Sequence, residues 1–183
     1  MRSERDKMLA GELYDPCDAE LAAARERARD LCLALNGSRA SQKAERRCIL
    51  EDLLGAGGDT ARVESPFHCD YGSNIRLGTN VFFNFNCVVL DVCAVCVGDF
   101  TLFGPGVQIL TPLHPFDAEL RRRQEFGKPI EIGADVWVGG GASILAGVRI
   151  GSGAVIGAGS VVAGRITGNA VWGGNPCRLL RPR

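Results

Sequence analysis

The chain has 183 residues, and its 21 Lys and Arg balance its 21 Asp and Glu, so the formal net charge is zero. This length suits one domain, with a core that needs no disulfide or metal to stabilise it. The neutral charge balance gives no indication of nucleic acid or an anionic membrane as a partner. Only two histidines, His68 and His114, are present, which excludes chemistry that needs three imidazoles from one chain.

The first residues carry mixed charge and lead into no apolar segment of the kind found in signal peptides. No stretch approaches the roughly 18 uninterrupted apolar residues of a membrane span. We therefore expect a cytoplasmic protein with no membrane partner. The eight cysteines are then expected to be reduced thiols.

The N-terminal third of the chain has a helical pattern. Residues 1–60 hold 22 of the 42 charged residues but only 5 of the 24 glycines. Asp18 is a suitable N-cap for a helix that runs to about Leu35, where Asn-Gly follows as a stop signal. We expect Ser41 to cap a second helix that runs to about Leu54, and a shorter helix over residues 3–9 to end before Gly11.

The rest of the chain repeats every six residues. Aliphatic residues recur at Ile132, Val138, Ile144, Ile150, Ile156 and Val162. The fifth residue of each hexad is small or aliphatic: Val136, Ala142, Val148, Ala154, Ser160 and Ile166. The same period covers Leu77, Phe83 and Val89 and, after a slip of two residues, Val97, Phe103 and Ile109. This period fits neither an amphipathic helix nor a hairpin meander and is typical of a parallel β-helix.

The repeat is interrupted once, between Ile109 and Ile132, which are 23 residues apart. Residues 111–129 have no hexad pattern, so we expect a loop ejected from the coil, and this loop contains His114. Loops carried on a rigid scaffold commonly bear the chemistry of a protein. The chain thus divides into an N-terminal helical segment, a β-helix that contains the loop, and a basic C-terminal tail (1–57, 58–175 and 176–183).

Longer motifs point beyond the repeat to one family. In chain order they are Lys7-Met8-Leu9-Ala10-Gly11-Glu12-Leu13-Tyr14, Cys69-Asp70-Tyr71-Gly72-Ser73-Asn74-Ile75, Asn84-Phe85-Asn86, Leu90-Asp91, the His114-Pro115 loop, Val136-Trp137-Val138-Gly139 and Gly173-Gly174-Asn175-Pro176-Cys177-Arg178. On these residues the chain resembles the maltose/galactoside O-acetyltransferases of the hexapeptide-repeat acyltransferase superfamily, almost from end to end. The hexads alone specify only the superfamily, whereas the N-terminal motif and the Asn-Phe-Asn segment are more specific.

The resemblance implies a left-handed parallel β-helix with an N-terminal α-helical segment and an extruded loop. The hand itself comes only from the resemblance, because the general rule favours right-handed crossovers. The resemblance also implies a homotrimer with active sites between neighbouring subunits. The implied reaction transfers an acetyl group from acetyl-CoA, as co-substrate, to a sugar hydroxyl, without a metal.

Two residues match the catalytic positions of the family. His114 is the general base by resemblance, and an imidazole suits this role because its ordinary pKa lies near ~6.5. A lone loop histidine is otherwise most often a surface residue. Asn84 matches the asparagine that stabilises the transition state, where fixed donors are needed for a developing oxyanion. The alternative for Asn84 is a turn residue at a corner of the coil.

Four carboxylates are candidates for binding the acceptor. Asp91 matches an acidic position near the acceptor, although a second aspartate found in some relatives is Val92 here. It could equally be a solvated corner residue. Asp70 corresponds to a polar position that lines the site, and Asp15 or Asp18 could reach the acceptor from the N-terminal segment.

The resemblance also supplies candidates for binding coenzyme A. Its pantetheine arm is expected along the β-helix near Gly139-Gly140 and Ala158-Gly159, with Trp137 either beside it or packed on the coil. Arg178 and Arg181 match phosphate-binding arginines, a role for which guanidinium groups suit well, although the basic tail could equally be disordered. Relatives often carry a lysine where this chain has Gly164, and Arg165 could replace that charge.

Other functions are less well supported by the sequence. The pair Cys93 and Cys96 has CxxC spacing but no second CxxC and no redox context, so zinc and thioredoxin-like functions are weakly supported. Cys87 and Cys93 hold fifth positions of hexads, and buried thiols that fill small core sites are the better interpretation for these two. The runner-up function is a hexapeptide acetyltransferase that acts on an antibiotic or an amino-acid hydroxyl. The alternative from another class is a non-catalytic β-helix trimer.

Overall fold

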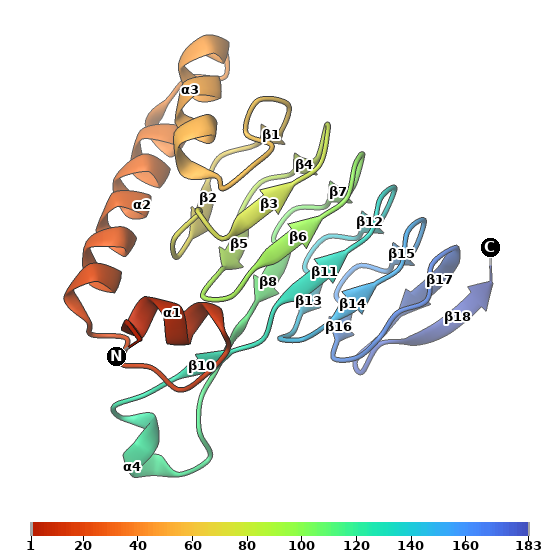
Figure 1. Cartoon of the computed structure of the whole chain (residues 1–183). Helices are drawn as coiled ribbons and strands as arrows, with labels where there is room; N and C mark the ends of the chain where they lie inside the picture. Colours follow the sequence, from red (N-terminus) through yellow and green to blue (C-terminus); the bar gives the residue numbers. More distant parts are fainter. Residues whose placement is uncertain (1, 183) are drawn as a thin grey trace.

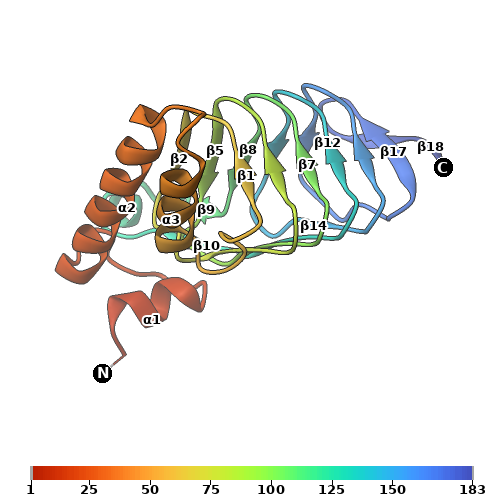
Figure 2. The same cartoon turned by 90° about the horizontal axis from the view of Figure 1, so that it is seen from above.

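The computed structural model describes residues 2–182. Met1 and Arg183, which end the expected N-terminal segment and the basic tail, lie outside the described residues. Three parallel sheets form the three faces of a coil. A helical cap covers one end of the coil, and the C-terminal strand closes the other end (Figures 1 and 2). A segment containing α4 projects from the side of the coil (Figure 1). The six-residue repeat of the sequence therefore predicted the parallel β-helix correctly.

Each turn of the coil passes through three faces in the same order. The first face contains β1 (Arg62–Val63), β4 (Phe82–Phe83), β7 (Leu102–Phe103), β12 (Trp137–Val138), β15 (Val155–Ile156) and β17 (Ala170–Gly173). The second face contains β2 (Phe67–Cys69), β5 (Cys87–Leu90), β8 (Gln108–Leu110), β13 (Ser143–Ile144) and β16 (Val161–Val162). The third face contains β3 (Ile75–Leu77), β6 (Val95–Val97), β11 (Ile130–Ile132) and β14 (Arg149–Ile150).

The chain turns at the edges of this prism, and two of these edges carry most of the predicted site residues. We call the edge where the chain passes from the first face to the second the first corner. It contains residues 84–86, 104–107, 139–142 and 157–160. The edge between the second and third faces is the second corner, and it contains residues 70–74, 91–94 and 111–129. The strands of the second face separate the two corners.

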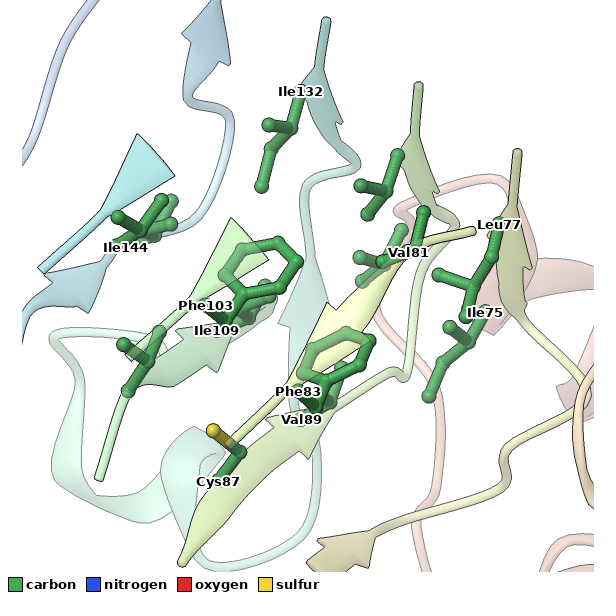
Figure 3. Packing of buried hydrophobic residues seen from close by; sticks show 14 of the residues in the cluster. Ile75, Leu77, Val81, Phe83, Cys87, Val89, Phe103, Ile109, Ile132 and Ile144 are labelled. Atoms are coloured by element: carbon green, nitrogen blue, oxygen red, sulfur yellow. The ribbon is translucent and has the colours of Figure 1, made fainter. Parts of the chain in front are cut away.

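The interior of the coil is filled by the hexad residues. Both the recurring aliphatic residues and the fifth residues of the hexads from Ile132 to Ile166 are buried. Phe83 and Phe103 stack with ring centroids 4.5 Å apart, and both point into the core with Ile109 and Ile144 (Figure 3). Because each coil buries its inward residues against the next, stability is distributed along the stack.

The N-terminal helices form where the sequence predicts them. They are α1 (Glu4–Leu9), α2 (Ala19–Gly37) and α3 (Lys43–Leu53). Asp18 caps α2 by accepting hydrogen bonds from the backbone of Glu20 and Leu21. The expected cap at Ser41 is wrong: Gln42 is the N-cap of α3 and makes no capping hydrogen bond through its side chain. The N-terminus of α3 thus lacks the side-chain acceptor that a serine cap would supply.

The interruption of the repeat is an extruded loop, as expected, but it has structure of its own. It contains β9 (Pro112–Leu113), the short helix α4 (Ala118–Arg121) and β10 (Phe126–Gly127). The strands β9 and β10 pair antiparallel, and Lys128 N donates to Thr111 O across the base of the loop. The coil then resumes in register, since Ile130 pairs with Val95 of the previous turn.

The C-terminal residues also differ from one expectation. Residues Arg178–Pro182 form β18, which pairs antiparallel with β17. The disordered alternative for the basic tail is therefore wrong for these residues. All eight cysteines are free thiols, and Cys87 lies fully buried in the coil as expected.

Candidate active site

His114 lies in the extruded loop, just after β9, with its side chain 53% exposed. Its Nε2 is 3.9 Å from Oε2 of Glu125, which lies directly before β10 on the returning arm of the same loop. The pairing of β9 with β10 brings these two residues to the same end of the loop. A carboxylate on one ring nitrogen leaves the other nitrogen of the imidazole available to accept a proton.

Glu125 is held from its other side by the N-terminal segment. Tyr14 and Glu125 form an antiparallel bridge, with Tyr14 N donating to Glu125 O at 3.0 Å and Glu125 N donating to Tyr14 O at 3.2 Å. The phenol of Tyr14 donates to Oε1 of Glu125. Burial, reinforced by the Glu125 carboxylate, raises the pKa of Tyr14 well above its ordinary value, so the phenol stays a donor at every working pH.

Asp70 lies close to this group at the second corner. Burial raises the pKa of Asp70, and the charge of Glu125 raises it further, while Arg25 and Arg29 act in the opposite direction. Asp70 is half-buried, so its carboxylate can reach a ligand. The predicted residues His114 and Asp70 therefore belong to one polar cluster, which also contains Glu125 and Tyr14.

Asp91 does not face this cluster as an acceptor-binding residue would. Its side chain is 0% exposed. Its Oδ1 accepts hydrogen bonds from the backbone of Asp70 and Tyr71, at 3.1 and 2.9 Å, and its Oδ2 accepts one from the backbone of Asn74 at 3.2 Å. The prediction that Asp91 binds sugar hydroxyls is corrected accordingly, and so is its solvated alternative. Asp91 is a buried anchor for the turn that carries Asp70.

The two N-terminal aspartates have different positions. Asp18 is the N-cap of α2 and uses Oδ1 for both capping hydrogen bonds. Asp15 accepts a hydrogen bond from the backbone of Cys17, and it is exposed and lines a hollow with Leu120, Arg123 and Gln124 of the extruded loop. Of this pair, only Asp15 lines a hollow with residues of the extruded loop.

Asn84 lies at the first corner, directly after β4. Its Oδ1 accepts a hydrogen bond from the backbone of Phe85 at 2.8 Å. The carbonyl end of the side chain is therefore held by the corner, and the amide group is the end left to donate. An oxyanion needs a fixed donor of this kind.

The glycines and alanine predicted to contact coenzyme A occupy the same first corner on successive turns. Gly159 N donates to Gly140 O, and Gly141 N donates to Pro105 O, so the corner is a backbone ladder. Gly139 is buried, and a Cβ there would lie 2.5 Å from the backbone nitrogen of Ala158. Close stacking of the turns therefore requires glycine at this position, whether or not a ligand binds.

The remaining predicted residues lie on or near the first face. Trp137 is 57% exposed and points outward from β12 rather than packing into the coil. Arg165 and Arg178 line one hollow of about 250 Å³ near the C-terminal end of the coil. Arg181 lies on the exposed strand β18, outside the set of residues that line this hollow.

The candidate residues thus form two groups in one chain. Asn84 and the predicted coenzyme A residues Gly139, Gly140, Ala158 and Gly159 share the first corner, whereas His114, Glu125 and Asp70 lie at the second corner. The second face separates them. Among residues 2–182, no group of three or more His, Cys, Asp or Glu could hold a metal ion. Within the same range, no helix combines the length and the apolar character needed to cross a bilayer.

Comparisons with known proteins agree with the motifs. Residues 7–58 match the family model described as the maltose acetyltransferase hexapeptide capping motif, and residues 129–164 match the bacterial transferase hexapeptide model. A maltose O-acetyltransferase from Clostridium difficile 630 is 43% identical, with a TM-score of 0.97 over 99% of this chain and 97% of its own. The chain belongs to the maltose/galactoside O-acetyltransferase family. The fold class predicted from the resemblance is thereby confirmed.

Three further proteins are similar to this member of the maltose/galactoside O-acetyltransferase family. Galactoside O-acetyltransferase of Escherichia coli K12 is 38% identical over 96% of this chain and 87% of its own length. Nodulation protein L of Rhizobium leguminosarum is 46% identical over 72% of this chain and 70% of its own. A hexapeptide-repeat acetyltransferase of Vibrio cholerae, solved with acetyl coenzyme A, is 39% identical, with a TM-score of 0.88 over 99% and 98% of the two chains.

Sequence reasoning missed Glu125 and Tyr14. Tyr14 belongs to the N-terminal motif, but the motif identifies a family and not a contact. Glu125 had one usable signal: it is a carboxylate in the same ejected loop as the only loop histidine. A histidine that acts as a base commonly has such a partner on its second nitrogen.

Proposed function

We propose that the chain is an acetyl-CoA-dependent O-acetyltransferase that transfers an acetyl group to a sugar hydroxyl. The observation that carries this proposal is the imidazole of His114, exposed in the loop and paired through Nε2 with Glu125 at 3.9 Å. A sugar hydroxyl is a poor nucleophile at neutral pH, so attack on a thioester needs a base at the hydroxyl proton. Membership of a family of maltose and galactoside O-acetyltransferases supports the substrate class.

In the proposed reaction His114 acts directly on the acceptor. Nδ1 accepts the hydroxyl proton while the hydroxyl oxygen forms a bond to the carbonyl carbon of the thioester. The amide of Asn84 donates to the oxyanion of the resulting tetrahedral intermediate. When the carbon–sulfur bond breaks, the imidazolium returns the proton to the sulfur, and the products are the acetyl ester and free coenzyme A.

We further propose that the chain acts as a homotrimer whose active sites lie between subunits. Within one chain, Asn84 and His114 lie on opposite edges of the second face, so a site that uses both needs the loop of one subunit beside the first corner of another. The outward side of the first face supports contact with a second copy. Apolar residues of neighbouring strands lie side by side on this surface, in the order Phe82, Leu102, Trp137, Val155 and Val171.

The coenzyme A is proposed to lie along the first corner, with its phosphates near Arg165 and Arg178. Both side chains line the same hollow, and Gly164 is among its other lining residues. A guanidinium in this hollow supplies the positive charge that relatives place one residue earlier, and Arg binds phosphate through paired, charge-assisted hydrogen bonds.

The experiment that tests the proposed function measures thiol release from acetyl-CoA with a panel of acceptors. The panel contains glucose, maltose, a galactoside, a chitin oligosaccharide, serine and a hydroxyl-bearing antibiotic. Acceptor-dependent release of free coenzyme A with a sugar supports the proposal, and mass spectrometry should then find the acetyl ester. Release only with serine or the antibiotic, or with no acceptor at all, would contradict it.

A further inference from the structure

The N-terminal segment reaches Glu125, the partner of the candidate base, through the buried residue Tyr14. Tyr14 is 0% exposed and packs with Met8, Leu21, Tyr71, Val92 and Cys93 in a cluster separate from the core of the coil. This cluster joins the N-terminal helices to the second corner and lies beneath the extruded loop. Cys93 Sγ donates to Met8 O at 3.3 Å, and a Cβ on Gly11 would lie 2.8 Å from Gly127 O, so the segment and the loop are closely fitted.

Within this contact, Tyr14 fixes the position of Glu125 by three hydrogen bonds. Two of them join the backbones of Tyr14 and Glu125, and the third runs from the phenol to Oε1 of the carboxylate. The Glu125 side chain is only 17% exposed, whereas that of His114 is 53% exposed. The more buried partner, which is held by hydrogen bonds, can therefore orient the more exposed one.

The two carboxylate oxygens of Glu125 have different partners. Oε1 accepts from Tyr14, and Oε2 faces Nε2 of His114. Without the phenol, the carboxylate would be free to rotate about its last bond, and Nε2 would lose its aligned partner. The position of an imidazole matters at this scale, because a misplacement of about 1 Å can cost about 10²-fold in rate.

We propose that Tyr14 is a positioning residue for the transfer reaction, acting on His114 through Glu125. The N-terminal segment then contributes to activity as well as to covering the end of the coil. This inference rests on the proposed function, because it takes His114 as the base. It assigns Tyr14 no contact with either substrate.

The test is a double-mutant cycle on kcat. Tyr14→Phe keeps the buried ring and removes only the hydroxyl group, and Glu125→Gln removes the charge that faces His114. We expect each single variant to lower kcat by about 10- to 100-fold and to leave KM for acetyl-CoA unchanged. Because both act through one contact, the double variant should be no slower than the slower single variant.

A matched control separates positioning from stability. Tyr71 is another buried tyrosine of the same cluster, and its hydroxyl accepts a hydrogen bond from Arg25 at 2.6 Å. Tyr71→Phe should therefore change Tm in the same way as Tyr14→Phe and leave kcat near wild type. Losses of kcat that follow Tm across the variants would overturn the inference.

The reference variant His114→Ala keeps the two proposals distinguishable. If His114→Ala retains wild-type kcat, the proposed function fails. If His114→Ala is inactive while Tyr14→Phe keeps wild-type kcat, or if the effects of Tyr14→Phe and Glu125→Gln multiply in the double variant, only the positioning role of Tyr14 fails. Should Tyr14→Phe not fold, the same decision is available from Tyr14→His, whose smaller aromatic ring does not overpack the buried site and retains a hydrogen-bond donor. Tyr14→His should retain more kcat than Tyr14→Leu.

Discussion

Oε2 of Glu125 lies 3.9 Å from Nε2 of His114, across the two arms of a loop whose base is closed by β9 and β10. The two residues are 11 positions apart in the sequence and meet because the arms pair antiparallel. This contact places the Glu125 carboxylate near Nε2 of His114. It also connects the proposed base to Tyr14, and hence to the N-terminal helices.

Replacing His114 with Ala should abolish most turnover and leave the fold intact. The side chain is half exposed and adds nothing to the buried core, so Tm should change little. Loss of a general base typically costs about 10²–10⁴ in rate. The measurement compares the steady-state kcat of His114→Ala and of the wild type with the best acceptor. Glu119→Ala, on the exposed surface of α4, is the control and should keep the wild-type kcat. A His114→Ala enzyme as fast as wild type would remove the assignment.

Replacing Asn84 with Asp should separate the donor from the shape of the side chain. Asp can still accept the hydrogen bond from the backbone of Phe85, so the corner should keep its form. It replaces the amide donor with a charged acceptor, and loss of one oxyanion donor costs about 10²–10³ in kcat. Pre-steady-state or steady-state kcat near wild type would argue that Asn84 is only a corner residue.

Mixing two inactive variants should restore activity if the site lies between subunits. His114→Ala chains keep Asn84, and Asn84→Ala chains keep His114, so a mixed trimer has an intact site wherever the two wild-type residues meet. Refolding or coexpressing equal amounts should recover up to about a quarter of the wild-type rate, given cyclic symmetry. Mixed particles with no more activity than either parent would indicate a site within one chain.

Arg165 should affect the co-substrate and not the acceptor. It lines the same hollow as Arg178, and no residue of the second corner cluster lines that hollow. Arg165→Ala should raise KM for acetyl-CoA by about 10- to 100-fold, since a charge-assisted phosphate contact is worth about 1.5–3 kcal/mol. Arg62→Ala, at the far end of the first face, is the matched control. Equal KM values for all three enzymes would exclude phosphate binding by Arg165.

Asp91 should make the protein more stable in mild acid. Burial raises its pKa from 3.8 to about 7, although backbone hydrogen bonds, among them those from Tyr71 and Asn74, act in the opposite direction. Between about pH 4 and pH 7, the folded chain keeps this proton and the unfolded chain has lost it. The free energy of unfolding contributed by Asp91 therefore decreases as pH rises through this window.

The measurement compares chemical denaturation of the wild type and Asp91→Asn at pH 5 and pH 8. The asparagine can still accept at Oδ1 from Asp70 and Tyr71, but it does not titrate. We expect the variant to lose less stability than the wild type between the two pH values. A variant with the same pH dependence as wild type would show that Asp91 does not titrate in this range.

The sequence predicted the coil well because the inward-pointing residues of a parallel β-helix recur at a fixed spacing along the sequence. Residues such as Ile132 and Val138 indicate by their spacing which side chains point inward, and the break after Ile109 indicates where the coil is interrupted. Within the loop no period exists, so the pairing of Pro112 with Gly127 could not be read from the chain. Such short strands depend on contacts rather than on local preference.

A site residue could be predicted where its own sequence surroundings indicate its role. A contact between two residues that are distant in the sequence could not be predicted. His114 stands out as a loop histidine next to proline, and its exposure agrees with a reactive role. Tyr14 and Glu125 are 111 positions apart, and the sequence around either residue gives no indication that the two are in contact. Asp91 was misassigned because the resemblance matched it to an acidic position near the acceptor, whereas its carboxylate is buried and accepts three backbone hydrogen bonds inside a turn.

The closed base of the extruded loop has an evolutionary consequence. Because β9 pairs with β10 and the coil resumes in register at Ile130, the intervening residues can lengthen, shorten or change composition without disturbing a single turn of the prism. New acceptor preferences could arise by exchanging the tip of the loop between His114 and Glu125, while the first corner, where the thioester is proposed to bind, is inherited unchanged from the scaffold.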